Sequence, residues 1–141
     1  MTSIELSERR TANEIALVRA MAPRFDAVIA SVFVRAASGS GRMDLPANMQ
    51  ALLRTIARDS SASRTPFVTV LFGNPYTAAF LQDLPAMLLT YDFYDRPERS
   101  AVRAIAGDAP IGGKLPIGIP GVAPRGTGLQ RAAVSPSAAG R

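Results

Sequence analysis

Apolar residues occur along the first third of the chain with two different spacings. Between Ser7 and Met21 they fall at helical spacing, which predicts a helix that ends near Pro23. Residues 27–34, AVIASVFV, are almost all apolar and rich in branched side chains. Such a run is typical of a strand that is buried on both faces, as in a parallel sheet.

Further helix and strand patterns follow along the chain. A helix is expected from Leu45 to the serine-rich stretch 59–63, followed by a second buried strand over residues 66–72. A third strand over 86–91 leads into a helix over 97–106. Strands that alternate with helices in this way predict a parallel sheet with helices packed on it.

The second strand is followed by the sequence FGNPY, a corner rather than a continuation. Gly73 can adopt backbone angles closed to other residues, and Asn74 is a good N-cap. Pro75 suits the first helical position, where its missing N–H costs nothing. A short helix is therefore expected from Pro75 to about Gln82, before Pro85 breaks it.

Residues 114–120, KLPIGIP, alternate apolar residues with proline and glycine. Period two predicts a strand, and because both prolines lack donors on the same side, it should be an edge strand. The final residues, 131–141, hold almost no core-forming side chains and are expected to be a disordered tail. The whole pattern indicates one three-layer α/β/α sandwich with a mostly parallel, flavodoxin-like sheet.

Composition narrows the chemistry that is open to the chain. The 141 residues are 48% hydrophobic and 19% charged, which suits a single domain. The absence of histidine and cysteine excludes Ser-His and Cys-His pairs and every His or Cys metal site. No apolar run approaches the length of a membrane helix, and residues 1–10 do not resemble a signal peptide. We therefore expect no membrane partner, metal or cofactor, and the compartment stays open.

The net charge of +5 does not indicate a nucleic-acid partner. Residues 1–122 carry 13 basic and 11 acidic side chains, and three arginines lie in the acid-free stretch that follows. The fifteen arginines are scattered along the chain and are not interleaved with aromatic residues. Nucleic-acid binding is therefore not expected.

Two loops hold the candidate ligand-binding residues. The loop GSGR at 39–42 lacks the spacing of a nucleotide-binding loop, but Arg42 and Asp44 follow a strand end, where open parallel sheets bind ligands. A flexible surface loop is the other interpretation, and it is the one that we favour. Asn74 and Asp92 follow the next two strands and complete the candidate set.

The segment that contains Asp92 allows two interpretations. Asp92 and Asp95 lie among aromatic residues, an arrangement that suits a sugar site or an acid and base pair. Asp95 and Glu98 also lie where they would stabilise the positive end of the helix that begins near Pro97. Helix capping is the interpretation that we favour.

Several of these segments together resemble a known family. The series FGNPY, LPAMLLTYD, AVRAIAGDAPIGGKLPIGIPG and GTGL, preceded by FDAVIASVFVRAASGSGRMDLPA, is similar to the C-terminal α/β sandwich domain of glycoside hydrolase family 3. The similarity is to the bacterial β-N-acetylhexosaminidase branch. It covers about residues 11–129, so residues 1–130 are expected to form that domain. The family domain has a further strand and helix upstream, so we expect an incomplete domain.

The resemblance implies a role without catalysis. In this family the nucleophile is an Asp on an N-terminal (β/α)8 barrel, and this branch takes its acid/base from an Asp-His pair on a barrel loop. A chain without histidine cannot supply that pair, and none of its glutamates, at 5, 8, 14 and 98, is placed like the acid/base Glu of family glucosidases. The implied partner is a catalytic barrel, with sugar at the interface between the domains.

Two hypotheses follow from these observations. The first is an accessory domain of a β-N-acetylhexosaminidase-like glycosidase, inactive as an isolated chain. The second is a small flavodoxin-like binding or interaction protein without glycosidase activity. If the sheet lacks its upstream strand, one edge should be exposed and apolar, which favours a homodimer.

Overall fold

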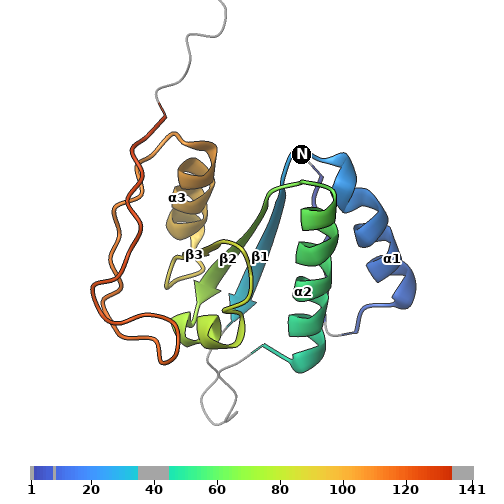
Figure 1. Cartoon of the computed structure of the whole chain (residues 1–141), viewed down its shortest axis with the longest axis horizontal. Helices are drawn as coiled ribbons and strands as arrows, with labels where there is room; N and C mark the ends of the chain where they lie inside the picture. The colour runs from blue at the N-terminus through green and yellow to red at the C-terminus, as the bar shows by residue number, and fades with distance from the viewer. Residues whose placement is uncertain (1, 8, 35–44, 135–141) are drawn as a thin grey trace, which may run out of the picture.

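The structure, a computed structural model, describes residues 2–7, 9–34 and 45–134. They form a small α/β fold in which a three-stranded, all-parallel sheet is flanked by helices (Figure 1). The elements in chain order are α1 (Ala12–Met21), η1 (Ala22–Arg24), β1 (Val28–Val34), α2 (Ala47–Ala62), β2 (Phe67–Gly73), η2 (Pro75–Phe80), β3 (Met87–Leu89) and α3 (Asp95–Ala106). The predicted alternation of strands and helices is confirmed.

The three strands lie in the sheet in chain order, β1-β2-β3. Seven residue pairs join β1 to β2, from Val28 opposite Phe67 to Val34 opposite Gly73. Only three pairs join β2 to β3, because β3 is limited to Met87–Leu89, shorter than the expected 86–91. Since all strands are parallel, their carboxyl ends meet at one edge of the sheet.

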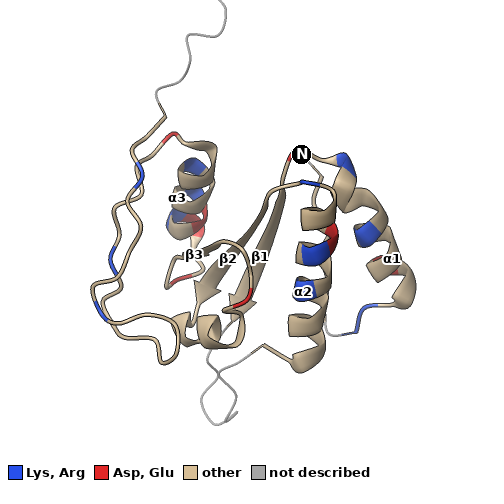
Figure 2. Ribbon diagram, in the orientation of Figure 1, with Lys and Arg blue, Asp and Glu red and all other residues tan. Residues whose placement is uncertain are grey.

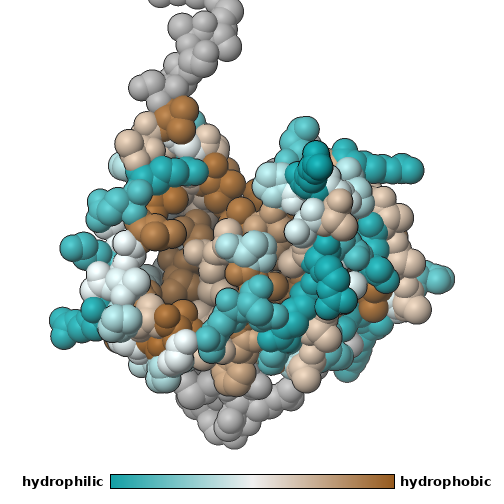
Figure 3. Space-filling view, in the orientation of Figure 1, coloured by the Kyte–Doolittle hydropathy of each residue, from teal (hydrophilic) through white to brown (hydrophobic). Residues whose placement is uncertain are grey.

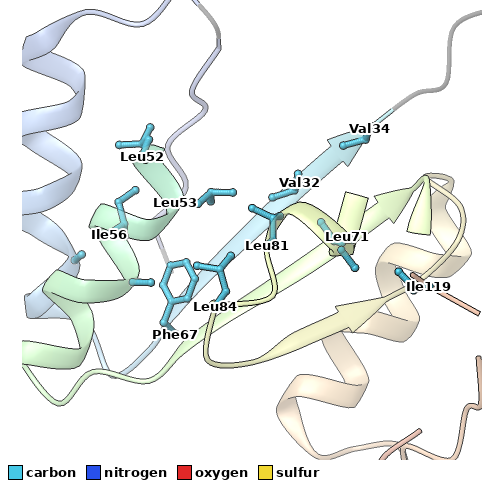
Figure 4. Packing of buried hydrophobic residues seen from close by; sticks show 13 residues of the cluster. Val32, Val34, Leu52, Leu53, Ile56, Phe67, Leu71, Leu81, Leu84 and Ile119 are labelled. Atoms are coloured by element: carbon cyan, nitrogen blue, oxygen red, sulfur yellow. The ribbon is translucent and has the colours of Figure 1, made fainter. Parts of the chain in front are cut away.

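The main core lies between one face of the sheet and α2 (Figure 4). Val32 and Phe67 point from the strands toward the buried face of α2, which carries Leu53 and Ile56, while Leu71 of the same cluster lies near Leu81 and Ile119. Each such side chain contributes about 1.5–3 kcal/mol when it is removed from water. This cluster is the principal stabilising feature of the fold.

A smaller cluster lies on the opposite face of the sheet. Val70 and Phe72 of β2 are buried there against Ala101 of α3, with the partly buried Ile105 beside them. Helices therefore contact both faces of β2, which explains why this strand is apolar at almost every position.

β1 corrects one expectation, because it is buried on one face only. Ile29 and Phe33 are 47% and 56% exposed, whereas Val32 and Val34 lie in the core. The apolar run 27–34 suggested a strand covered on both sides. In the structure the second cluster reaches β2 and β3 but leaves the side chains of Ile29 and Phe33 open.

The N-terminal helix begins five residues later than expected. Thr11 caps α1, because its hydroxyl accepts a hydrogen bond from the backbone N–H of Glu14 while the Glu14 carboxylate accepts one from the N–H of Thr11. This capping box sets the start at Ala12 and not at Ser7. Its hydrogen bonds from the backbone and hydroxyl of Thr11 lower the pKa of Glu14.

The ends of the other helices agree more closely with the sequence pattern. α2 runs through the serine-rich stretch to Ala62, and α3 ends at Ala106, where Gly107 forms a left-handed cap with a φ of 87°. α3 begins at Asp95, two residues before Pro97.

Two ion pairs connect α2 to neighbouring segments, one from Arg19 of α1 to Asp59 and one from Arg54 to Asp83.

The predicted edge strand at 114–120 is wrong. Residues 111–131 instead form an irregular antiparallel hairpin with isolated bridges between Ile111 and Arg131 and between Ile119 and Ala123. Pro116 and Pro120 have no N–H to donate, so a continuous ladder cannot form on their side. The hairpin is nevertheless anchored, because Ile119 is 2% exposed and belongs to the main core.

The hairpin lies beside α3 and leads into the C-terminal residues (Figure 1). Within the described part of the expected tail, Arg131 exchanges backbone hydrogen bonds with Ile111, and the N–H of Val134 donates to the carbonyl of Gly107. Residues 131–134 are therefore held against the domain. Residues 135–141 lie outside the described residues, and their expected disorder stays a prediction.

Candidate functional site

The carboxyl edge of the sheet brings together the ends of three strands and two of the four candidate residues. Asn74 follows β2, and Asp92 lies three residues beyond the end of β3. Arg42 and Asp44 fall within 35–44, outside the described residues. In open parallel sheets this edge is where ligands bind, so its described part is the candidate site.

Gly73 forms the corner at the centre of this edge. Its φ is 92°, and a Cβ atom built on it would lie 2.4 Å from the carbonyl oxygen of Val34 and 3.3 Å from Cδ1 of Phe93. Only glycine tolerates both the angle and the close approach. The next residue, Asn74, donates its backbone N–H to the same Val34 carbonyl. The corner thus locks the end of β1 to that of β2.

Asn74 acts as the helix cap that the sequence predicted. Its side-chain oxygen accepts a hydrogen bond of 3.1 Å from the backbone N–H of Tyr76, and Pro75 begins the helix. The helix that follows is a 3-10 helix that ends at Phe80, two residues short of the expected Gln82. The side chain of Asn74 therefore has a structural task at the edge of the site.

The segment after β3 is fixed by Thr90. Its single hydroxyl proton lies within reach of two carbonyls, that of Asp92 at 2.8 Å and that of Leu71 at 3.2 Å. The Asp92 carboxylate accepts the backbone N–H of Phe93 at 2.8 Å through Oδ1. Asp92 is thus held half-buried in a tight turn, beside the Phe93 ring that contacts the Gly73 corner.

Tyr91, between Thr90 and Asp92, has an unusual backbone conformation. Its φ of 63° lies in the left-handed region, which costs a residue with a side chain about 1–2 kcal/mol. Desolvation by burial raises the pKa of its phenol above the ordinary value of 10. The hydroxyl therefore stays protonated at neutral pH and can donate a hydrogen bond. Strained residues of this kind often lie at functional sites.

Aromatic side chains follow the ends of both β2 and β3; those beside Asp92 were part of the sequence prediction, whereas the exposed Tyr76 after β2 was not. Tyr76, Tyr91 and Tyr94 are 38%, 42% and 67% exposed, and Phe93 packs against Tyr94 with ring centroids 5.4 Å apart. The signal was present as the repeated aromatic residues in FGNPY and YDFY. Exposed tyrosines next to a carboxylate suit a ligand that has both an apolar face and hydroxyl groups.

The favoured capping role of Asp95 and Glu98 is supported in part. Both lie in the first turn of α3, where a negative charge stabilises the helix dipole. The cap residue itself is Tyr94, and no side chain makes a capping hydrogen bond there. The two carboxylates therefore act on the helix through their charge alone.

A second recess, of about 600 Å³, lies between β3, α3 and the start of the hairpin. Hydrophobic surface gathers in a hollow of this region (Figure 3). Its apolar lining includes Leu88, Ala104 and Ile111, while Arg96 and Arg103 line it from α3. Neither guanidinium forms an ion pair within the described residues.

The charged residues elsewhere do not form one basic face. Lysine and arginine residues are spread over α1, α2, α3 and the hairpin, with acidic residues interspersed on the helices (Figure 2). Within residues 2–7, 9–34 and 45–134, no group of three acidic residues could hold a metal ion. The described helices include none that is both long and apolar enough to cross a membrane.

Comparisons of the chain with models of protein families, with curated proteins and with solved structures found no match. The function must therefore be argued from the sequence and the geometry of the carboxyl edge.

Proposed function

We propose that this chain is an accessory domain of a β-N-acetylhexosaminidase-like glycoside hydrolase, inactive in isolation. Its resemblance to the C-terminal domain of glycoside hydrolase family 3 supports this role, with a three-layer, flavodoxin-like sandwich as the underlying fold. The parallel sheet and the helices that contact both faces of β2 are compatible with that fold. The proposed partner is a catalytic (β/α)8 barrel.

The observation that carries the proposal is the set of exposed tyrosines that follow β2 and β3, Tyr76, Tyr91 and Tyr94, which we call the aromatic rim of the carboxyl edge. Tyrosine rings that are open to solvent can stack on the apolar faces of sugar rings, and the half-buried Asp92 carboxylate, next to Tyr91 in the chain, would accept hydrogen bonds from sugar hydroxyls. The rim supplies recognition but no catalytic pair. The sequence has no histidine, Glu14 is engaged in the cap of α1, and Glu98 lies in the first turn of α3. Chemistry is therefore assigned to the barrel.

An activity assay tests the inactive role directly. The isolated chain should release no product from an aryl β-N-acetylglucosaminide, and clear turnover would overturn the proposal. A reading frame next to this gene that encodes a (β/α)8 barrel is the expected genomic context. The barrel alone should gain activity when the chain is added.

A binding experiment tests the rim itself. Titration of the chain with N-acetylglucosamine, followed by NMR, should shift signals of residues 74–76 and 90–94. Tyr94→Ala should weaken these shifts, while Phe25→Ala, which removes a 38% exposed aromatic residue before β1, should leave them unchanged. Equal effects of the two substitutions would count against a sugar-facing rim.

The recess beside α3 favours a second candidate, a small binding protein for an anionic ligand. Arg96 and Arg103 are two helical turns apart, so their guanidinium groups would contact opposite ends of a carboxylate or phosphate compound. A thermal-shift screen of small carboxylates and phosphates should then find a stabilising ligand. Loss of that stabilisation in Arg96→Gln, with no loss in Arg125→Gln on the hairpin, would support this candidate over the accessory role.

A further inference from the structure

The outer edge of β1 is a row of backbone groups that no described strand pairs. The N–H of Val28 donates to Pro66, and the carbonyl of Val34 accepts from Asn74, so the even-numbered residues of β1 bond to β2. Backbone groups alternate sides along a strand. The N–H and C=O groups of Ile29, Ser31 and Phe33 therefore point away from the sheet, where β1 has no neighbour in the described structure.

The side chains of these three residues are also uncovered. Ile29 and Phe33 are 47% and 56% exposed, and Ser31 between them is exposed as well. They share the face that α3 covers only over β2 and β3. Phe33 is fixed in place by Phe72, since the two rings stack with centroids 4.6 Å apart and planes 8° from parallel. The exposed side chains of Ile29 and Phe33 thus form an apolar surface along the same outer edge of β1 as the free backbone groups.

Within residues 2–7, 9–34 and 45–134, nothing protects this edge from pairing with another strand. Natural edge strands carry charges, prolines or bulges that prevent another strand from adding to them. Val28–Val34 contains no charged residue and no proline, and its register with β2 is unbroken over seven pairs. All charged residues lie outside this strand, so two copies can approach here without repulsion between like charges on β1, although the chain carries a net charge of +5.

We propose that a second copy of this chain occupies the edge, with the two β1 strands antiparallel and Ser31 on the two-fold axis. Ser31 is the central residue of β1, and Ile29 and Phe33 lie symmetrically on either side of it. In this register each Ile29 is opposite the partner's Phe33, and Ser31 is opposite its own copy. All three outward-facing residues then exchange both backbone hydrogen bonds with the opposite strand.

This register makes the interface self-complementary, as a two-fold dimer requires. The two sheets join into one six-stranded sheet, and two identical Ile-Phe cross-strand pairs remove apolar surface from water. The dimer uses the β1 edge and not the aromatic rim, so it goes beyond the proposed function and does not depend on it.

Light scattering after size exclusion is the first test, with an expected mass of twice 14.9 kDa. Ser31→Lys should give a monomer, because two ammonium groups would meet across the axis. Like charges directly opposite in a sheet are destabilising, and we expect at least about a tenfold rise in the dimer Kd. Ser31→Glu should give a monomer for the same reason.

The decisive experiment mixes the two variants and measures whether a dimer forms. Since Ser31 meets its own copy, Ser31→Lys and Ser31→Glu should recover a dimer only when combined. Ser100→Lys, the same change at an exposed position on α3, should remain dimeric. Circular dichroism would verify that each variant is folded. A monomeric wild-type chain at high concentration, or a dimer that Ser31→Lys leaves intact, would overturn the proposal.

Discussion

Gly73 approaches the carbonyl oxygen of Val34 so closely that a Cβ atom in its place would lie 2.4 Å away. The same carbonyl accepts the backbone N–H of Asn74 at 3.2 Å. One glycine therefore joins the ends of β1 and β2 and sets the direction in which the chain leaves the sheet toward η2. The geometry of the carboxyl edge depends on this contact.

Gly73→Ala should lower the free energy of unfolding by at least about 2 kcal/mol. About 1–2 kcal/mol comes from the left-handed backbone angle, and displacement of the Val34 carbonyl adds to it. Gly126→Ala is the matched control, because Gly126 has φ 88° but nothing within 4 Å of an added Cβ atom. Urea unfolding of both variants measures the difference. Equal losses would show that the contact with Val34 does not matter.

Ile119 tests whether the hairpin is part of the core. Its side chain is 2% exposed and belongs to the main cluster, so Ile119→Ala should cost about 2–5 kcal/mol. Leu129→Ala, on the returning arm, removes a side chain that is 87% exposed and should cost almost nothing. Thermal unfolding by circular dichroism would compare the two. An Ile119 variant as stable as the wild type would mean that the hairpin is not packed against the domain.

Sequence reasoning was most successful where local chemistry sets the structure. The parallel order of the strands followed from the alternation of patterns, and Asn74 was identified as a cap from residue type alone. These features depend on residues within a few positions of one another. Their physical causes are therefore visible in a short stretch of sequence.

Long-range packing explains what the sequence did not predict. The apolar run of β1 does not reveal that its outer face lacks a covering helix, because that depends on where α3 packs. The alternation in 114–120 suggested a strand, but its partner is the returning arm of a proline-rich hairpin. Of the four candidate site residues, only Asn74 and Asp92 lie in the described edge. The exposure of the tyrosines around them depends equally on tertiary packing.

Thr69 offers a test by stabilisation. This residue is fully buried in the centre of β2, and its hydroxyl has no hydrogen-bond partner among the described residues. Thr69→Val removes an unsatisfied polar group and should raise the free energy of unfolding by about 1 kcal/mol. Thr77 is equally buried but has an interaction partner, so Thr77→Val should not bring the same gain in stability. Chemical denaturation would read both changes, and a loss of stability in Thr69→Val would contradict the prediction.

The ion pair between Arg54 and Asp83 predicts a pH-dependent contribution to stability. The hydrogen bond from Arg54, at 2.7 Å, lowers the pKa of Asp83 below its ordinary value of 3.8. A carboxylate with a depressed folded pKa stabilises the fold above pH 3.8, and this contribution is lost as the pH falls through the folded pKa. Because both groups face solvent, Asp83→Asn should cost no more than about 0.5 kcal/mol at pH 7.

The difference between wild type and Asp83→Asn should therefore shrink below pH 3.8 and disappear in stronger acid. Urea denaturation at a series of pH values measures it, and added salt should reduce it at neutral pH. Asp108→Asn is the control, since Asp108 is exposed and forms no ion pair among the described residues. A difference for Asp83→Asn that persisted unchanged in acid would mean that the charge of Asp83 is not what stabilises this contact.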